Sequence, residues 1–384
     1  HGAGLRRWFD TLDGIRRRLR VLTDNQRSLP WWLLNGPVFP LRFWPILAHE
    51  RTTVGGFLDR LFGEDEAVKV ALCANYQYYA ASVRELSLLF FAAGQGSYHR
   101  GGWYVHGGSQ ALSDLLASQI REAGGETLTR RPAQRILVEG GRVAGVVHCD
   151  RKGRDSREAG APVVFGNAAP HVLATMLDDE HRQSFEAPWK DLAVSTSLWS
   201  AYLAFDEDPT KLGMEHYSTF CFPDQVVALA SADTSRLMAS SPSGPMPVYA
   251  AVNYSRIRSG LQRGAKHLVV LCGADRLDNW ASLGREEYQG RKRAWLKALT
   301  ADLLDRFPGL RGHQVYGELA TARSVQRYLR TPGGAVYGFA QRPDQAGLRR
   351  PSPRTAIEGL LLASAFTQPG GGFTGAMLAG QNAA

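Results

Sequence analysis

The glycine-rich C-terminal segment constrains the fold of this chain more than any other part of its sequence. It reads as an apolar strand, a tight turn and the start of a helix near Thr374. Gly370, Gly372 and Gly375 have the spacing G-x-G-x-x-G, which is typical of dinucleotide-binding turns between a strand and a helix. Nine residues follow Gly375, too few for a βαβ unit, so we do not expect this turn to open a Rossmann domain. Its glycines would still let backbone N–H groups approach a ligand, and the helix N-terminus would favour negative charge.

Three further segments carry glycine or proline where turns are expected. They are Gly101–Leu116 (GGWYVHGGSQALSDLL), Val163–Pro170 (VVFGNAAP) and Pro332–Phe339 (PGGAVYGF). Together with the C-terminal turn they resemble, in the same order, four motifs of the phytoene desaturase and carotenoid isomerase-like flavoproteins, within the amine-oxidase-type FAD superfamily. The resemblance extends from about residue 52 to the end of the chain. It implies an FAD-dependent oxidoreductase.

The resemblance implies a mixed α/β fold with two discontinuous domains. One is an FAD-binding domain of the amine-oxidase type, and the other is a substrate domain in which helices back a mixed sheet. We expect residues 1–98 to form a helical lid or membrane-facing part of the substrate domain and residues 99–185 to form a first FAD-domain segment. Residues 186–313 should form the main substrate-domain segment, and residues 314–384 should form a second FAD-domain segment. The two FAD-domain segments should therefore meet in space.

The beginning of the chain departs from the resembled family. Members of that family begin with a strand, a G-x-G-x-x-G turn, a helix and a second strand, and residues 1–97 supply no such unit. We therefore expect either a fragment that lacks the N-terminal βαβ unit or a homologue that lost half of its cofactor site, and we favour the fragment. In both cases the chain alone should hold FAD weakly.

The resemblance also assigns cofactor contacts to individual residues. The C-terminal turn is expected to lie against the isoalloxazine ring and the pyrophosphate, and the strand at 135–138 against adenine. The expected contacts are Gly370, Gly371, Gly372, Phe373, Thr374, Gly375, Met377, Ala365, Ile136, Leu137, Asn167, Gly107 and Gly108. For the last three, a purely local turn is an equally good interpretation. Ser364 stands where the family often has glycine, which is a departure within the site.

No residue pattern identifies a catalytic acid or base. Glu318, Arg323 and Tyr337 are weak candidates, because the resembled family places their segments near its active site. The alternative is a strand with one solvated edge. Hydride transfer from a polyene to flavin needs no strong base, since delocalisation stabilises the developing charge, so the catalytic residues stay unknown at this point.

The composition argues against several other classes of protein. The four cysteines are widely spaced without a C-x-x-C pair, and the ten histidines form no ligand motif, so we expect neither a disulfide framework nor a metal. The formal net charge is +9, and arginines gather at residues 16–20, 151–154 and 349–350. No nucleic-acid-binding motif accompanies them. We expect these arginines on solvated surfaces or against anionic lipid rather than on DNA.

The segment Leu29–Leu47 is unusually rich in tryptophan and proline. Its composition is that of an interfacial membrane anchor, although a core or a lid over an apolar tunnel would use the same residues. As an anchor it should form one exposed apolar patch rimmed by positive charge, made of Trp31, Trp32, Phe43, Trp44, Arg42 and the cluster at residues 16–20. No apolar run is long enough to span a bilayer as a helix. We expect a cytoplasmic protein attached peripherally to a membrane, alone or as a subunit of an oligomer or membrane complex.

Hydrophobic periodicity and turn residues predict the main elements. Helices are expected at residues 3–22, within 52–97 after an N-cap at Thr52 or Thr53, at 109–123 and at 286–306. Strands are expected at 126–129, 135–139, 143–149, 162–165, 198–205, 226–230, 247–253 and 267–272, with a charged surface loop at 150–160.

Two functions of different class are consistent with these features. The first is FAD-dependent desaturation, saturation or isomerisation of a long apolar polyene, such as a carotenoid or another isoprenoid. The second is a non-catalytic, membrane-associated binding or accessory subunit with the same fold. An amine oxidase proper is a weaker third option, because nothing in the sequence indicates a polar-tipped aromatic cage. Flavin absorbance of the purified protein distinguishes the first function from the second.

Overall fold

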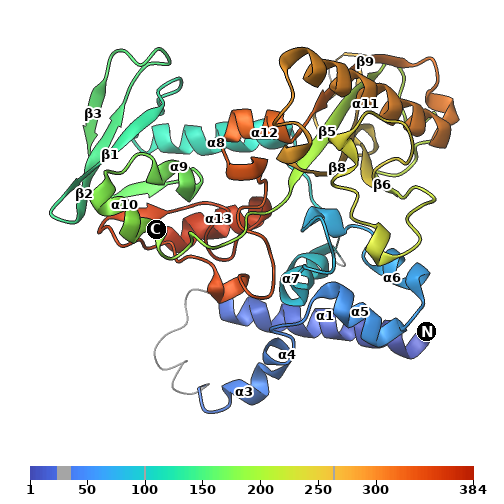
Figure 1. Ribbon diagram of the computed structural model, residues 1–384, viewed down its shortest axis with the longest axis horizontal. Coiled ribbons are helices and arrows are strands. Elements are labelled where there is room, and N and C mark those ends of the chain that lie inside the picture. The colour runs from blue at the N-terminus through green and yellow to red at the C-terminus, as the bar shows by residue number, and fades with distance from the viewer. Residues whose placement is uncertain (24–35, 99–100, 263) are drawn as a thin grey trace.

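The computed structural model of the chain describes residues 1–23, 36–98, 101–262 and 264–384. Figure 1 shows three groups of elements: N-terminal helices along one side, a five-stranded sheet with its helices at one end, and two smaller sheets with helix α13 at the other end. This mixture confirms the expected α/β class. Within the described ranges, no helix is both long and apolar enough to cross a membrane.

The N-terminal group consists of helices around one aromatic core. Its members are α1 (Gly2–Thr23), α3 (Phe39–Arg42), α4 (Trp44–Leu47), α5 (Val54–Phe62), α6 (Glu66–Leu72) and α7 (Leu88–Tyr98). Trp8 of α1 stacks on Phe57 of α5 with ring centroids 5.9 Å apart. Thr53 caps α5, since its hydroxyl accepts a hydrogen bond from the N–H of Gly56 at 3.1 Å. The helices expected at 3–22 and within 52–97 are therefore confirmed.

The expected membrane patch is only partly present among the described residues. Trp31 and Trp32 lie outside them. The exposed position predicted for Phe43 is wrong: this side chain is buried, because α4 packs against α1 and the ring lies 4.5 Å from that of Phe39. Trp44, in contrast, is 64% exposed, and Leu41 beside it is 82% exposed.

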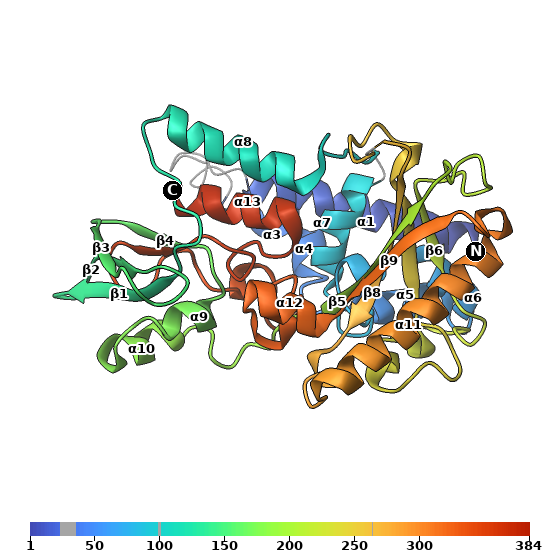
Figure 2. The same cartoon turned by 90° about the horizontal axis from the view of Figure 1, so that it is seen from above.

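The five-stranded antiparallel sheet has the order β6-β7-β8-β5-β9. Its strands are β5 (Ser197–Phe205), β6 (Ser218–Cys221), β7 (Tyr249–Asn253), β8 (His267–Asp275) and β9 (Gln314–Ala320). The long helix α11 (Arg285–Arg306) lies alongside the sheet (Figure 2) and buries Trp295 and Leu299 against one face. Trp199 and Leu203 of β5 point into the same core. The other face is turned towards η1 (Tyr76–Tyr78) and α7.

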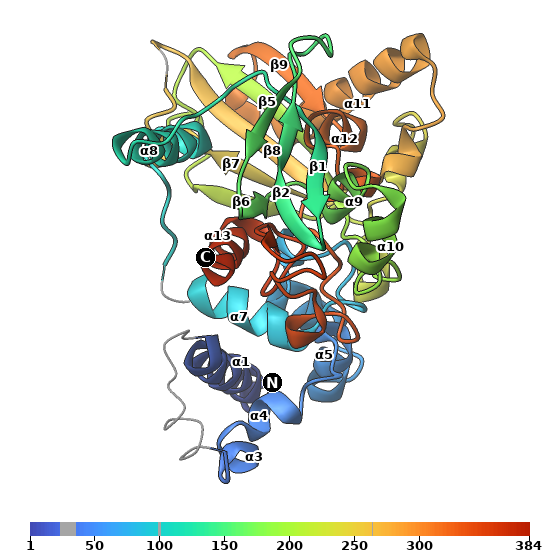
Figure 3. The ribbon, with the colours of Figure 1, turned by 90° about the vertical axis from the view of Figure 1, so that its left-hand side faces the viewer.

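The other end of the molecule holds the elements expected for the FAD domain (Figure 3). β1 (Ala133–Glu139), β2 (Arg142–His148) and β3 (Arg157–Gly160) form one sheet, and β4 (Val164–Gly166) pairs in parallel with β10 (Leu360–Leu362). The helices are α8 (Gly108–Glu122), α9 (Pro170–Ala174), α10 (Asp179–Glu186) and α13 (Gly372–Ala383). Short 3-10 helices elsewhere span Leu229–Ser231, Leu237–Ala239, Tyr254–Arg256, Leu277–Asn279, Pro308–Leu310, Pro332–Gly334 and Gly347–Arg349.

The parallel pairing joins two segments that are far apart in the sequence. Leu360 lies opposite Val164, and Leu362 lies opposite Gly166. Both leucines share a buried core with Ile136, Leu173, Phe339 and Phe366. The expectation that segments 99–185 and 314–384 meet in space is thus confirmed for the parts that build this core.

Several expected strands differ from the structure. Residues 226–230 form a turn and a 3-10 helix rather than a strand, because Pro223 opens a turn and Val226 and Leu229 pack into the N-terminal core. Residues 126–129 form an exposed irregular segment and no strand. The surface loop expected at 150–160 contains β3, whose backbone pairs with the edge of β2.

The five-stranded sheet also extends past the domain boundary expected at residue 313. β9 pairs with β5, with Glu318 opposite Tyr202, and α12 (Ala322–Leu329) packs against β5. Strand pairing therefore places residues 314–329 with the five-stranded sheet. The division of the chain into FAD-domain and substrate-domain segments stays a prediction.

Candidate functional site

The best candidate site lies where the glycine-rich turn enters α13. Gly370, Gly371 and Gly372 have φ angles of +78°, +72° and +53°, in the left-handed region that favours glycine. A Cβ at Gly375 would overlap the carbonyl oxygen of Gly370, so glycine at 375 lets the turn close against the first turn of the helix. At Gly372, by contrast, a Cβ would meet no atom of the described residues within 4 Å, apart from its own chain neighbours and helix backbone. The turn thus has a packed side and an open side.

The open side carries four of the thirteen residues expected to contact the cofactor. Gly372, Phe373, Thr374 and Met377 are exposed, and Phe373 is 70% exposed. The first N–H groups of a helix have no partner within it, and the helix dipole places partial positive charge there. The structure therefore brings these residues together at one helix N-terminus, which suits the anionic part or the polar edge of a ligand.

Arg350 closes the packed side of the turn. Its guanidinium donates hydrogen bonds to three backbone carbonyl oxygens, those of Phe339 (2.9 Å), Ala365 (2.7 Å) and Thr367 (3.3 Å). The side chain is 2% exposed, and burial lowers the pKa of the guanidinium to about 10 without help from a nearby charge. A positive charge thus lies under the turn, and no carboxylate in the described part of the chain pairs with it. The expected surface position of Arg350 is wrong, whereas its neighbour Arg349 does pair with Glu50 at the surface.

A second buried polar side chain lies beside Gly371, the N-cap of α13. Gln341 is 2% exposed, and among the described residues neither atom of its amide group has a hydrogen-bond partner. A Cβ at Gly371 would lie 3.3 Å from Gln341 Nε2 and 2.7 Å from the ring of Phe90. The sequence analysis missed Gln341 and the burial of Arg350, because a single polar residue in an irregular segment gives no periodic signal of burial.

The ends of β4 and β10 lie at the same edge as the turn, because the two strands are parallel. The N–H of Ala363 donates to the carbonyl oxygen of Gly166 at 3.0 Å, which places the exposed Asn167 at this edge. The carbonyl oxygen of Ala365 accepts from the N–H of Gly371 at 3.4 Å. Ser364 is buried and uses its hydroxyl to accept from the N–H of Phe366 at 3.3 Å. The serine therefore supports the turn from within.

The other expected cofactor residues lie elsewhere in the fold. Ile136 is a core residue of β1 whose N–H donates to the carbonyl oxygen of Met176 at 2.9 Å, and Leu137 pairs with Gly145 across the hairpin. Gly107 and Gly108 lie at the start of α8 and contact the segment between β7 and β8, since the N–H of Gly107 donates to the carbonyl oxygen of Ser259 at 2.7 Å. Cofactor contact by these four residues stays a prediction.

The weak catalytic candidates are not gathered in one site. Glu318 is exposed on β9, where it accepts a hydrogen bond from the hydroxyl of Tyr316 at 3.0 Å. Arg323 donates to the carbonyl oxygen of Leu283 at 2.8 Å and covers the ring of Tyr288, so it joins α12 to the chain before α11. In the described residues, no group of three or more His, Cys, Asp or Glu side chains could hold a metal ion.

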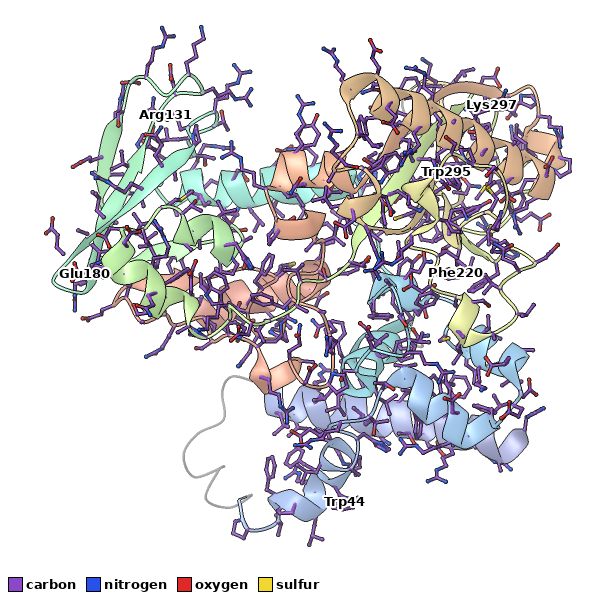
Figure 4. All side chains as sticks on the ribbon, in the orientation of Figure 1. Trp44, Arg131, Glu180, Phe220, Trp295 and Lys297 are labelled. Carbon is purple, nitrogen blue, oxygen red and sulfur yellow. The ribbon has the colours of Figure 1, made fainter. Side chains whose placement is uncertain are left out.

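Tyr337 has a different position, between the helical group and the sheet. Its hydroxyl donates to the carbonyl oxygen of Gln77 at 3.2 Å, and burial raises its pKa well above the usual range. Close to it, Tyr78 meets Phe220 of β6 edge to face at 5.4 Å and Tyr98 of α7 at 6.1 Å. Figure 4 shows Phe220 at this junction. The face of the sheet opposite α11 is therefore lined by aromatic rings.

Three curated relatives cover most of the chain at low identity. Over 98% of its own length, the chain is 26% identical to the hydroxyneurosporene desaturase of Cereibacter sphaeroides. Over 72% of its length, it is 21% identical to the all-trans-retinol 13,14-reductase of Danio rerio. Over 96% of its length, it is 24% identical to the pyridine nucleotide-disulfide oxidoreductase domain-containing protein 2 of Mus musculus. It spans 70%, 47% and 65%, respectively, of the lengths of these relatives.

Solved structures show the same fold at lower identity. An oxidoreductase from Methanosarcina mazei superposes with a TM-score of 0.55 and 14% identity, covering 88% of this chain and 70% of that one. A putrescine oxidase with bound putrescine has a TM-score of 0.55 and 11% identity, covering 98% and 74%. At these identities the likeness concerns the fold alone.

The match to a protein family is more extensive. A family model described as flavin containing amine oxidoreductase matches residues 48–384, which include the glycine turn, Arg350 and Gln341. The positive-φ glycines, the open helix N-terminus and the unpaired amide of Gln341 fit the FAD cofactor of such enzymes. The chain therefore belongs to the family of FAD-dependent, flavin containing amine oxidoreductases.

Proposed function

We propose that this protein oxidises, reduces or isomerises a long apolar polyene of the carotenoid or isoprenoid class at FAD bound to the open side of the α13 turn. The observation that carries the proposal is the position of this turn. Its open side is at Gly372 and Phe373, the preceding Gly371 adjoins the Gln341 amide, which has no partner among the described residues, and its packed side rests on Arg350. An anion or a polar ring edge at this position would meet backbone donors and a fixed positive charge.

The residues of this chain would hold and orient the cofactor. Bound FAD would supply the two-electron chemistry. The N–H groups at the start of α13 would donate to its negatively charged or polar parts, and Arg350 would favour negative charge nearby. Gly370 and Gly375 would keep the turn in shape, and Ala365 and Asn167 would line the adjoining strand edge.

Two observations support a polyene as substrate. The names of the first two relatives refer to a desaturase for hydroxyneurosporene and a reductase for all-trans-retinol, and both of those molecules are polyenes. The aromatic face around Tyr78, Tyr98 and Phe220 offers flat apolar surface between the helical group and the sheet. Each Å² of apolar surface removed from water contributes about 25 cal/mol, so a long polyene gains from such a lining.

We also propose that the protein works at a membrane surface. Leu41, Trp44 and Leu47 are exposed on the two short helices α3 and α4, and Val38 is exposed just before α3. Figure 4 shows Trp44 at the outer edge of the molecule. Arg42 is exposed between them. Exposed aliphatic and aromatic side chains next to arginine suit the headgroup region of an anionic bilayer. A lipid-soluble polyene could enter from there without crossing water.

The experiment that tests the proposed reaction is anaerobic flavin reduction. The protein is loaded with FAD and mixed under anaerobic conditions with a carotenoid in detergent micelles, or with a primary amine as the competing substrate class. The proposal expects a change in the flavin absorbance or in the polyene spectrum with the carotenoid, and none with the amine. Reduction by the amine alone would contradict it, and failure to hold any flavin would favour a non-catalytic subunit.

A further inference from the structure

The amide of Gln341 is buried, and neither its nitrogen nor its oxygen has a hydrogen-bond partner among the described residues. Burying an amide without a hydrogen bond is unfavourable, because its hydration is lost and not replaced. Gln345, four residues later and also buried, shows the usual solution: its Nε2 donates to the carbonyl oxygens of Ala193 (2.7 Å) and Ala340 (2.9 Å), and its Oε1 accepts from the N–H of Ala193. Both polar atoms of the Gln345 amide are therefore hydrogen-bonded, whereas those of the Gln341 amide have no partner among the described residues.

The surroundings of Gln341 indicate what the free amide faces. Its backbone carbonyl oxygen accepts from the N–H of Ser87 at 2.8 Å, which fixes the residue between the start of α7 and the glycine turn. Its Nε2 lies next to Gly371, the N-cap of α13, with the ring of Phe90 on the same side of that glycine. The next residue, Gly372, is open. The amide thus lies beside the helix N-terminus, and a ligand there could satisfy both of its atoms.

The chemistry of an amide narrows the choice of ligand. A glutamine side chain offers two N–H donors and one carbonyl acceptor. A phosphate group accepts only, so it would leave the amide oxygen unpaired, and an apolar polyene would leave both atoms unpaired. The pyrimidine edge of an isoalloxazine ring alternates carbonyl oxygens with an N–H group, so it can accept from and donate to the same amide.

We propose that Gln341 is a cofactor-binding residue whose side-chain amide pairs with the pyrimidine edge of the flavin ring. This inference rests on the proposed function for the presence of FAD at the turn, and it adds a contact that the glycine motif does not supply. Two hydrogen bonds of ordinary strength correspond to about a ten- to thirtyfold change in affinity.

The test compares Gln341→Met with the matched control Gln345→Met. Both changes replace a buried amide by an apolar side chain of similar length. Dissociation constants for FAD and for riboflavin are measured by flavin fluorescence, and the melting temperature of each protein is measured without flavin. We expect Gln341→Met to weaken FAD and riboflavin by the same factor, about tenfold or more, because both share the ring. Without flavin it should melt at or above the parent temperature, whereas Gln345→Met should melt lower.

The outcomes separate the two proposals. If the parent binds neither flavin, the proposed cofactor site fails, and the role of Gln341 fails with it. If the parent binds FAD and Gln341→Met binds it equally well, only the role of Gln341 is overturned. A loss confined to FAD would place the amide at the phosphates and overturn the ring contact. A melting temperature lowered as in Gln345→Met, with unchanged flavin affinity, would show a purely structural residue.

Discussion

Arg350 packs against Gly370 so closely that a Cβ at residue 370 would overlap its guanidinium group. The same guanidinium donates hydrogen bonds to the carbonyl oxygens of Phe339 and Ala365, which belong to two separate segments of the chain. The buried guanidinium of Arg350 therefore supports the packed side of the glycine turn, while the open side at Gly372 stays uncovered. This division between a packed and an open side leads to the first prediction.

Gly370→Ala should destabilise the protein far more than Gly372→Ala. Both positions have positive φ, so alanine costs about 1–2 kcal/mol at either of them. Only at residue 370 must the buried Arg350 also move, which should raise the loss to more than about 3 kcal/mol. Urea unfolding of both variants measures the difference. Equal losses would show that Arg350 does not support the turn.

The buried carboxylate of Asp275 predicts a dependence of stability on pH. It accepts hydrogen bonds from Trp280 Nε1 (2.8 Å), Asn279 Nδ2 (2.8 Å) and the N–H of Ala322 (2.8 Å), yet burial raises its pKa from 3.8 to about 6. A raised pKa in the folded state means that the folded protein binds the proton more tightly. Protonation of Asp275 therefore stabilises the folded protein below pH 4. This contribution to the free energy of unfolding, about 3 kcal/mol, is lost as the pH rises through 6.

The measurement is urea unfolding of the parent and of Asp275→Asn between pH 4 and 8. The asparagine variant should be less stable overall, because its NH₂ group would face N–H donors, but it should lack this part of the pH dependence. Parallel pH profiles for the two proteins would contradict the raised pKa.

Membrane attachment should depend on the exposed residues of α3 and α4. Replacing Leu41 and Trp44 by serine should abolish flotation with vesicles that contain anionic lipid, because it removes the apolar contact with the headgroup region. Trp103→Ser is the matched control, since Trp103 is fully exposed but lies before α8. If the parent, the double variant and the control all remain in the soluble fraction, the membrane proposal should be dropped.

The sequence predicted the fold well wherever side chains follow a regular period. Apolar residues alternate in the strand expected at 198–205 and recur with helical spacing in the helix expected at 286–306. Both elements are present with nearly the expected limits. Gly140 and Gly141, which both have positive φ, form the turn between β1 and β2. Edge strands were harder: β3 and β6 carry no apolar alternation, because their pairing depends on a neighbouring backbone edge rather than on buried side chains.

The candidate site shows the same limit. The glycine pattern predicted where the turn and the start of α13 lie, because positive φ restricts the choice of residue. Gln341 and Arg350 are polar residues in irregular segments, and their burial follows from packing between β10, α7 and α13. Only the assembled structure brings them to the turn.

The central claim is that FAD binds at the open side of the turn, and it is tested most directly by Gly372→Val. Gly153→Val is the matched control, because Gly153 also has positive φ and open surroundings but lies in the loop between β2 and β3. FAD affinity is measured for the parent and both variants by fluorescence titration. The account predicts that valine at 372 weakens FAD binding by at least about tenfold, since its side chain would occupy the space that the cofactor needs, while valine at 153 leaves it unchanged. Equal FAD affinity of the parent and Gly372→Val would contradict the site.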